Sequence, residues 1–312
     1  IMSEISNNKV ENTLDIIEIV KLLWNQKIII ISITSIFAIF SVFYALSIPN
    51  QYQSSALLKV NNINNESSGG LSSLASQYGG LASMAGLSIP SSGLDSGTYA
   101  MNIIKSREFA KHLMSFDKIK QNLMATKSFD LSQKKIIYNE EVYDHNKNLW
   151  VREPSGGLGS EPSYLEVHET ALKKLEVAKD DQTGLITISF EHYSPIFAQE
   201  LVSIVISEVN KVTREIKLKE SNAALDYLKN ETSKVTQKDL KNNINVLIQK
   251  QLNEKMLASV KEDYLLSIID SAIIPEYKSN PKRARICILI TLLGGIISLI
   301  VSFLRHIYSI KK

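Results

Sequence analysis

The sequence predicts an α+β protein in which two membrane-spanning helices flank a large body. Residues 28–46 and 286–304 contain no charged side chain, and at about 1.5 Å per residue each run can cross a hydrocarbon core of about 30 Å. Between the two runs, the sequence combines strand-like alternation with a long stretch, 196–274, that contains neither glycine nor proline. Strands and helices are therefore both expected in the body.

The first apolar run could also be a cleaved signal peptide, because Ala45 and Ser47 are small enough to resemble a cleavage site. However, the run is longer than the usual apolar segment of a signal peptide, and acidic residues precede it. A retained helix is the favoured interpretation. Trp24 and Lys27 would then be interface anchors.

The two spans divide the chain into five segments. Because the number of spans is even, both termini lie on one side of the membrane, and Arg305, Lys311 and Lys312 favour the cytoplasm for that side. The expected segments are a cytoplasmic segment over 1–27, a transmembrane helix over 28–48, the body over 49–281, a second transmembrane helix over 286–304, and a cytoplasmic tail over 305–312.

Composition excludes some classes of function. The formal net charge is only +3, and no basic field appears that would attract nucleic acid. The single cysteine, Cys287, lies inside the second span. Disulfides therefore cannot hold the body together, and packing or oligomerisation must do so.

The first elements can be read in chain order. Residues 1–27 carry apolar side chains at helical spacing, and residues 52–60 alternate as a strand does. Residues 66–97 are rich in glycine and serine, as in a flexible linker. Apolar residues nevertheless recur there at helical spacing, which favours one or two short helices: Leu71, Leu74, Tyr78, Leu81 and Ala85.

The middle of the body contains the clearest strand. Residues 100–114 have the pattern of an amphipathic helix, 150–162 form a turn-rich insertion, and 164–179 are helical by composition. Within residues 185–192, apolar and polar side chains alternate from Ile186 to Glu191. This segment is expected to be a strand with Ile186, Ile188 and Phe190 on one face.

A long helix is expected after this strand. Ser194 and Pro195 form a helix-start signature, and apolar residues then recur every three or four positions. Over about 221–260 the repeat continues, with one longer gap after Val235. A single helix there would reach about 60 Å and would need a second chain or an antiparallel partner to cover its apolar side chains.

The last strand-like segment, 265–274, is expected to pair with 52–60 and so to bring the two membrane helices side by side. Each membrane run also carries small residues four positions apart, a spacing that lets two helices approach closely. These pairs are Ser41 with Ala45 and Gly294 with Ser298.

The sequence contains no catalytic or metal-binding motif. It lacks a GxxxxGK[ST] loop, an HExxH pair and a GxSxG setting. The five histidines are dispersed and are interpreted as packing or surface residues: His112, His145, His168, His192 and His306. We therefore expect no enzyme activity, no cofactor and no metal.

Several stretches together resemble the Wzz-type chain-length determinants, or polysaccharide co-polymerases. The similar stretches are IIKSREF at 103–109, TGLITISFEHYSPIFAQEL at 183–201 and the approach to the second span. The most specific part is the cluster of Pro275, Ser279, Pro281, Lys282 and Ala284, followed by Gly294 and Gly295 and by Ser298. The resemblance extends over nearly the whole chain.

The resemblance implies an α+β base near the bacterial inner membrane, a long helix that projects into the periplasm, and a ring-like homo-oligomer. The expected partners are a Wzy-type polysaccharide polymerase, its lipid-linked glycan and membrane lipid, and the expected role is to set the modal length of O-antigen or a related glycan. Two alternatives share the topology. One is the auxiliary co-polymerase subunit of an ABC-type capsule exporter, and the other is a two-span membrane sensor, for which 1–27 and 305–312 are short output segments.

Overall fold

The computed structural model describes residues 24, 26–61, 95–153 and 159–310, with side chains up to residue 305. It forms two compact units, one made of Ile1–Pro49 and Asn280–Lys312 and the other of Asn50–Ser279. The helix expected within 1–27 and the short helices expected over 71–85 lie outside the described residues.

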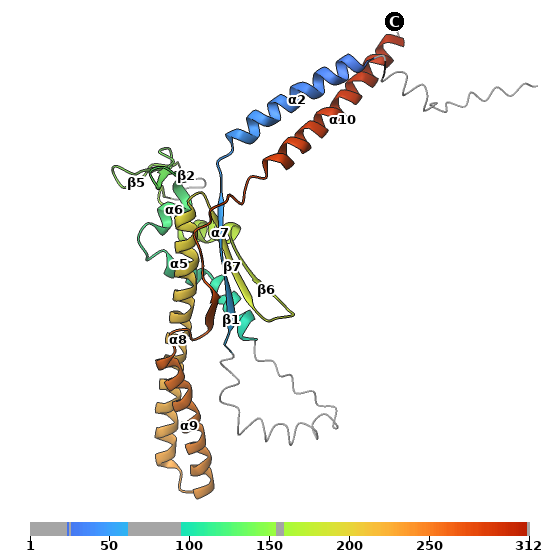
Figure 1. Ribbon diagram of the computed structural model, residues 1–312. Coiled ribbons are helices and arrows are strands. Elements are labelled where there is room, and N and C mark those ends of the chain that lie inside the picture. The colour runs from blue at the N-terminus through green and yellow to red at the C-terminus, as the bar shows by residue number, and fades with distance from the viewer. Residues whose placement is uncertain (1–23, 25, 62–94, 154–158, 311–312) are drawn as a thin grey trace, which may run out of the picture. The chain divides into compact units, whose positions relative to one another are not determined.

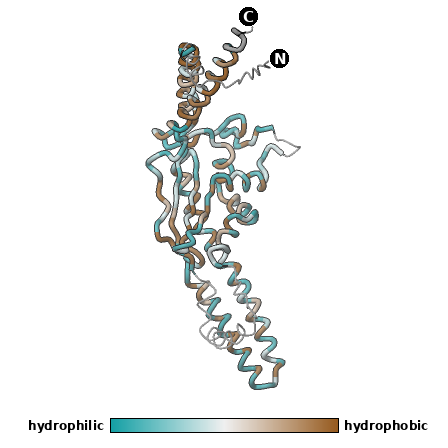
Figure 2. The backbone as a smooth tube through the Cα atoms, turned by 90° about the vertical axis from the view of Figure 1, so that its right-hand side faces the viewer, coloured by the Kyte–Doolittle hydropathy of each residue, from teal (hydrophilic) through white to brown (hydrophobic). Residues whose placement is uncertain are grey.

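The first unit is a pair of antiparallel helices, α2 (Lys27–Ser47) and α10 (Arg283–Ile310), which lie side by side (Figure 1). Both are long and apolar enough to cross a membrane, and only 11% and 17% of their most apolar windows are buried. Figure 2 shows hydrophobic residues along nearly their whole length. Such exposure is not that of a core helix in a soluble protein, and the predicted pair of flanking apolar helices is confirmed.

The second unit is built on a four-stranded antiparallel sheet in the order β6-β7-β1-β8. The central strands are β1 (Tyr52–Val60) and β7 (Ile186–His192), and the edges are β6 (Leu175–Lys179) and β8 (Leu266–Asp270). The expected strands at 52–60 and 185–192 are thus confirmed, as is the pairing of the last strand with the first.

One face of the sheet forms the core. Leu58, Ile188 and Phe190 are each fully buried there, and α8 (Pro195–Lys234) contacts β1 and β7. The helix starts where the sequence predicted, because the Ser194 hydroxyl accepts a hydrogen bond from the Phe197 backbone N–H at 3.2 Å. The confirmed fold class is therefore a mixed helix and sheet body flanked by two apolar helices.

Two of the predicted helix boundaries are wrong. The helix expected over 100–114 is divided into α4 (Ser96–Ile104) and α5 (Arg107–Leu113), because Ser106 caps a new helix through a bond from the Phe109 N–H. The helix expected over 164–179 ends earlier, as α7 (Tyr164–Lys174), and β6 follows. Alternating side chains and pairing with β7 outweigh the helical composition there.

Between α6 (Ile119–Ala125) and α7, the chain forms two small hairpins. The first joins β2 (Thr126–Asp130) to β3 (Lys135–Tyr138), and the second joins β4 (Tyr143–Asp144) to β5 (Leu149–Trp150). Strands this short leave little periodicity in a sequence, so pattern analysis does not detect them.

The single helix expected over about 221–260 is also wrong. Helix α8 ends at Lys234, and the chain reverses into α9 (Lys238–Val260), which returns along α8 (Figures 1 and 2). An ion pair of 2.7 Å between Lys217 and Glu254 joins the two helices. The break falls at the irregular gap after Val235, so the antiparallel partner is the chain itself, and a long helix extends from the sheet as expected.

Candidate functional site

The candidate site in the first unit is the interface between α2 and α10. Gly294 lies against α2 so closely that an added Cβ would meet the Cβ of Phe37 at 2.4 Å. No larger residue fits there without a shift of one helix. The small residues Ser41, Ala45 and Ser298 are also buried. Both predicted small-residue pairs therefore lie at buried positions of the two helices.

Three polar contacts fix the register of the helix pair. At one end the Ser302 hydroxyl donates to Gln26 Oε1 at 3.0 Å, and at the other Arg283 Nε donates to the Ala45 carbonyl at 3.1 Å. Between them the Cys287 thiol donates to the Ser41 carbonyl at 3.8 Å. Hydrogen bonds are well retained in an apolar surrounding, because no water competes for the donors.

Gly295 has a different environment from Gly294. Nothing lies within 4 Å of the position that its Cβ would occupy. It lines an apolar groove of about 630 Å³ with Thr34, Thr291, Ile296 and Leu299 among its neighbours. The two glycines therefore differ in their surroundings. Gly294 allows α10 to pack closely against α2, whereas Gly295 lies in an open groove on the helix pair.

The motif residues before α10 fall into both units. In the first unit, the Pro281 and Lys282 carbonyls accept the bonds that begin α10, from the Arg283 and Arg285 backbone N–H groups, both at 2.9 Å. The Lys282 and Ala284 side chains are exposed. These residues start the helix.

In the second unit, Ser279 is tied to the sheet. Its N–H donates to the Gln51 carbonyl at 2.8 Å, and its hydroxyl contacts Glu191 Oε1 at 2.5 Å. Pro275 lies upstream, half-buried, and the Ser54 hydroxyl donates to the carbonyl of Ile273 at 2.7 Å. The segment after β8 is thus held along β1, with Pro275 and Ser279 in the same path.

A small charged cluster surrounds Glu191. Burial lowers the pKa of Lys174, against the opposing effect of the nearby Glu191 carboxylate, and the Lys174 ammonium lies 5.5 Å from the centre of the Tyr193 ring. Burial, together with the Lys174 charge, lowers the pKa of His192 to about 3. His192 is therefore a neutral packing residue, as the sequence analysis interpreted it.

Several partners in these contacts were not identified from the sequence. Phe37, Gln26 and Glu191 carry no motif, and only the alternation of β7 indicated that Glu191 lies opposite the core face. Among the described residues, no group of three or more His, Cys, Asp or Glu side chains could hold a metal ion.

Comparisons with known proteins give a family match and similar solved structures. The family model for chain length determinant proteins, Wzz, matches residues 12–115. Among solved structures, the chain is similar to a full-length bacterial polysaccharide co-polymerase, at 13% identity and a TM-score of 0.39, covering 95% of this chain and 98% of that one. No curated protein matches the sequence.

The family match starts ahead of α2 and ends just after α5, so it includes the first membrane helix, β1 and the helices that follow. This is the part of the chain that contributes Phe37, Ser41 and Ala45 to the helix pair and Gln51 to the Ser279 contact. The match of residues 12–115 to the Wzz chain length determinant model confirms the resemblance seen in the sequence.

Proposed function

We propose that the protein is a non-enzymatic regulator of polysaccharide chain length that acts as a membrane-anchored oligomeric scaffold. It controls the modal length of O-antigen or a related glycan made by a Wzy-type polymerase. The observation that carries this proposal is the chain length determinant match over residues 12–115. In this proposal the body is periplasmic, and both termini are cytoplasmic at the bacterial inner membrane.

Self-assembly is supported by the apolar side chains that α8 and α9 leave uncovered. Tyr227 is 65% exposed, Val246 57% and Met256 57%, although α8 and α9 already cover each other in part. Large apolar side chains spaced along a helical hairpin favour contact with another protein surface. The occupant in this proposal is the same hairpin of a neighbouring copy, which gives a ring when repeated.

The polymerase is assigned to the groove at Gly295. A membrane helix gains close packing where a glycine lets two backbones approach, and Gly294 already serves the internal pair. Gly295 remains for a helix of another protein, and the neighbouring Thr34 and Thr291 hydroxyls can bond across such a contact. In this proposal, Pro275 and Ser279 lie in the segment that leads to α10, and Pro281, Lys282 and Ala284 start that helix.

The test is the length distribution of surface glycan in a deletion strain and in the same strain complemented with the wild-type chain. We expect the modal cluster to disappear on deletion and to return on complementation. Lipopolysaccharide and capsule are analysed separately, so that a change confined to capsule supports the capsule-export alternative. Unchanged ladders in both polymers would refute the proposal.

Gly295→Leu and Gly294→Leu separate the two parts of the scaffold. Gly295→Leu is expected to keep the protein in the membrane but to abolish its copurification with the polymerase. Gly294→Leu instead disturbs the helix pair itself. Retained copurification of the Gly295→Leu protein would exclude the groove as the polymerase contact.

A further inference from the structure

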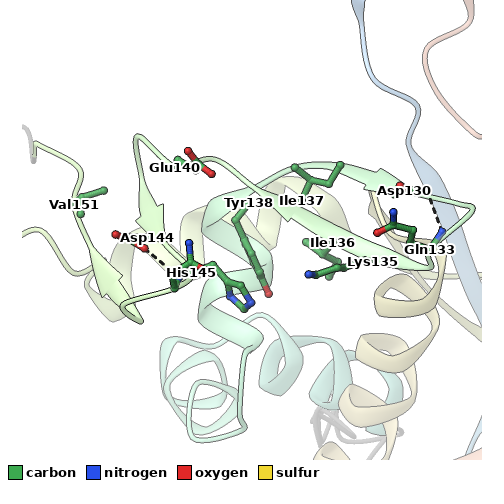
Figure 3. A pocket seen from close by; sticks show the side chains of 11 residues that line it. Asp130, Gln133, Lys135, Ile136, Ile137, Tyr138, Glu140, Asp144, His145 and Val151 are labelled. Atoms are coloured by element: carbon green, nitrogen blue, oxygen red, sulfur yellow. Dashed lines mark hydrogen bonds between the residues drawn. The ribbon is translucent and has the colours of Figure 1, made fainter.

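The two small hairpins line an open pocket of about 510 Å³ (Figure 3). We call it the hairpin pocket. Its walls come from the β2–β3 hairpin, the connection that contains Glu140, and the β4–β5 hairpin with Val151 after it. The volume lies within the range of about 300–1,000 Å³ that is typical of small-molecule sites.

Some of the lining groups are already engaged and hold the walls in place. The Asp130 carboxylate accepts from the Ser132 N–H at 2.8 Å, and the Asp144 carboxylate accepts from the Asn146 N–H at 3.0 Å. The Tyr138 hydroxyl donates to Asn122 Oδ1 at 2.6 Å. These bonds fix both hairpin turns and one aromatic ring before any ligand arrives.

Three other polar side chains of the pocket do not hold its walls in place. Within the part of the chain that the structure describes, neither a hydrogen bond nor an ion pair engages the side chains of Gln133, Glu140 and Asn146. A carboxylate accepts hydrogen bonds through two oxygens, and an amide both donates and accepts. Together they match a ligand that presents several neighbouring hydroxyl groups.

The pocket also has flat and apolar parts. The rings of Tyr138 and His145 stack with centroids 5.1 Å apart and planes 28° from parallel, and Figure 3 shows them next to each other. Ile137 and Val151 also line the cavity and are 46% and 43% exposed. Such surfaces suit the C–H face of a sugar ring, which is apolar while its hydroxyl edge is polar.

The charges of the lining residues limit the kind of ligand that the pocket can bind. The lining contains Asp130, Glu140 and Asp144 and one permanent cation, Lys135, and a second ammonium, that of Lys147, lies 3.3 Å from the Asp144 carboxylate. An excess of carboxylates disfavours phosphate groups and acidic sugars. Hydrogen bonding from the Lys147 backbone N–H lowers the pKa of Asp144, which keeps this carboxylate an acceptor rather than an acid.

We propose that the hairpin pocket binds a neutral or amino-bearing saccharide, one to two sugar residues of the glycan whose length the protein controls. The proposal rests on the proposed function for the identity of the glycan, and on Glu140, Gln133 and Asn146 for its recognition. The step is binding alone, with no bond made or broken.

The test uses the full chain in lipid nanodiscs, because detergents with sugar headgroups would compete. The probes are repeat-unit oligosaccharides released from the producing cells' own glycan, and binding is measured by saturation-transfer NMR. In a Trp24→Phe background, the fluorescence of Trp150, which pairs with Tyr143 beside the pocket, gives the affinity.

We expect Glu140→Ala and Gln133→Ala each to weaken binding about tenfold or more. Glu141→Ala is the matched control, since this neighbouring carboxylate is exposed and lies outside the pocket lining, and it should bind as the wild type does. Inorganic pyrophosphate and glucuronate should not compete.

The inference is overturned if the oligosaccharides show no saturation transfer, if Glu140→Ala binds like Glu141→Ala, or if pyrophosphate displaces the sugar. These results leave the proposed function intact, because the glycan ladder of the deletion strain tests that function without reference to the pocket. Conversely, an unchanged ladder together with Glu140-dependent binding would refute the proposed function and retain a sugar site.

Discussion

Asn210 on α8 forms hydrogen bonds with both backbone groups of Leu266 on β8. Its Oδ1 accepts from the Leu266 N–H at 2.8 Å, and its Nδ2 donates to the Leu266 carbonyl at 2.8 Å. The same oxygen accepts from the Leu265 N–H at 2.9 Å. Asn210 is only 3% exposed, so a single buried amide ties the central helix to the edge strand.

Replacing Asn210 with leucine should destabilise the body. The change leaves three buried backbone groups without their partner, and each unsatisfied group costs about 1–3 kcal/mol. We expect the free energy of unfolding to fall by about 3 kcal/mol or more, measured by denaturant unfolding of the full chain in nanodiscs. Asn222→Leu, at an exposed position of the same helix, is the control. Equal stability of the two variants would show that the amide contributes nothing.

The contact between Gly294 and Phe37 predicts how the membrane helices respond to a larger residue. Ser41→Cys places a second cysteine near native Cys287, whose thiol bonds to the Ser41 carbonyl, and oxidation should join the two in high yield. Gly294→Leu should reduce this yield strongly, and adding Phe37→Ala should restore it, because the clash is with that ring. Gly295→Leu should leave the yield unchanged. A low yield in the Gly295 variant would contradict the assignment of the two glycines.

Much of the fold could be predicted because its elements have long, regular patterns. The alternation at 52–60 and 185–192 and the Ser194–Pro195 start of α8 were sufficient to place β1, β7 and the central helix. The boundary at Lys174 could not be read, because helical composition continues to Lys179 and only pairing with β7 makes Leu175–Lys179 a strand. Similarly, residues 235–237 contain neither glycine nor proline, so the turn between α8 and α9 had only an irregular apolar spacing as its signal.

The candidate site, too, could be predicted from the sequence only in part. The sequence identified Gly294 and Gly295 as a pair, but only the rotation of α10 against α2 decides that one contacts Phe37 and the other faces a groove. Ser279 was identified without Glu191, which lies far from it in the chain. The hairpin pocket was missed altogether, since the strands that form it are too short to leave a pattern.

The buried His192 predicts how the stability of the body depends on pH. Its Nε2 contacts the Asn122 carbonyl at 2.9 Å, and its Nδ1 accepts from the Ser194 N–H at 3.1 Å, so both nitrogens are occupied in the neutral form. The folded-state pKa, about 3, lies below the ordinary value of 6.5. Between these values the unfolded chain binds the extra proton, and stability therefore falls as the pH falls from about 6.5 towards 3.

The slope due to one such group is at most about 1.4 kcal/mol per pH unit. It should be measured between pH 4.5 and 8, because Glu166, whose pKa Arg152 lowers to about 2, adds its own loss of stability below 4.5. His192→Gln should flatten this part of the profile relative to the wild type. An unaltered slope in His192→Gln would contradict the neutral assignment.

The contacts of the Ser279 hydroxyl predict a smaller loss of stability than the contacts of Asn210 do. Ser279→Ala removes the hydroxyl's contacts with Glu191 at 2.5 Å and with the Gln51 carbonyl at 3.1 Å, but it retains the backbone N–H bond to Gln51, so the path of the segment persists. Glu191 also has a further interaction. We therefore expect the free energy of unfolding to fall by only about 1 kcal/mol. Unfolding of the full chain measures it, with the exposed Lys278→Ala as the control. A change equal to that of Lys278→Ala would mean that the hydroxyl does not hold the segment.

The most direct measurement of the scaffold account is glycan synthesis by purified polymerase in liposomes, with and without this protein. With the wild-type chain, we predict that the broad product distribution gathers around one modal length, while liposomes that contain this protein alone neither form nor cleave a glycosidic bond. A distribution that does not change when the protein is added, or a glycan altered by the protein alone, would contradict the account.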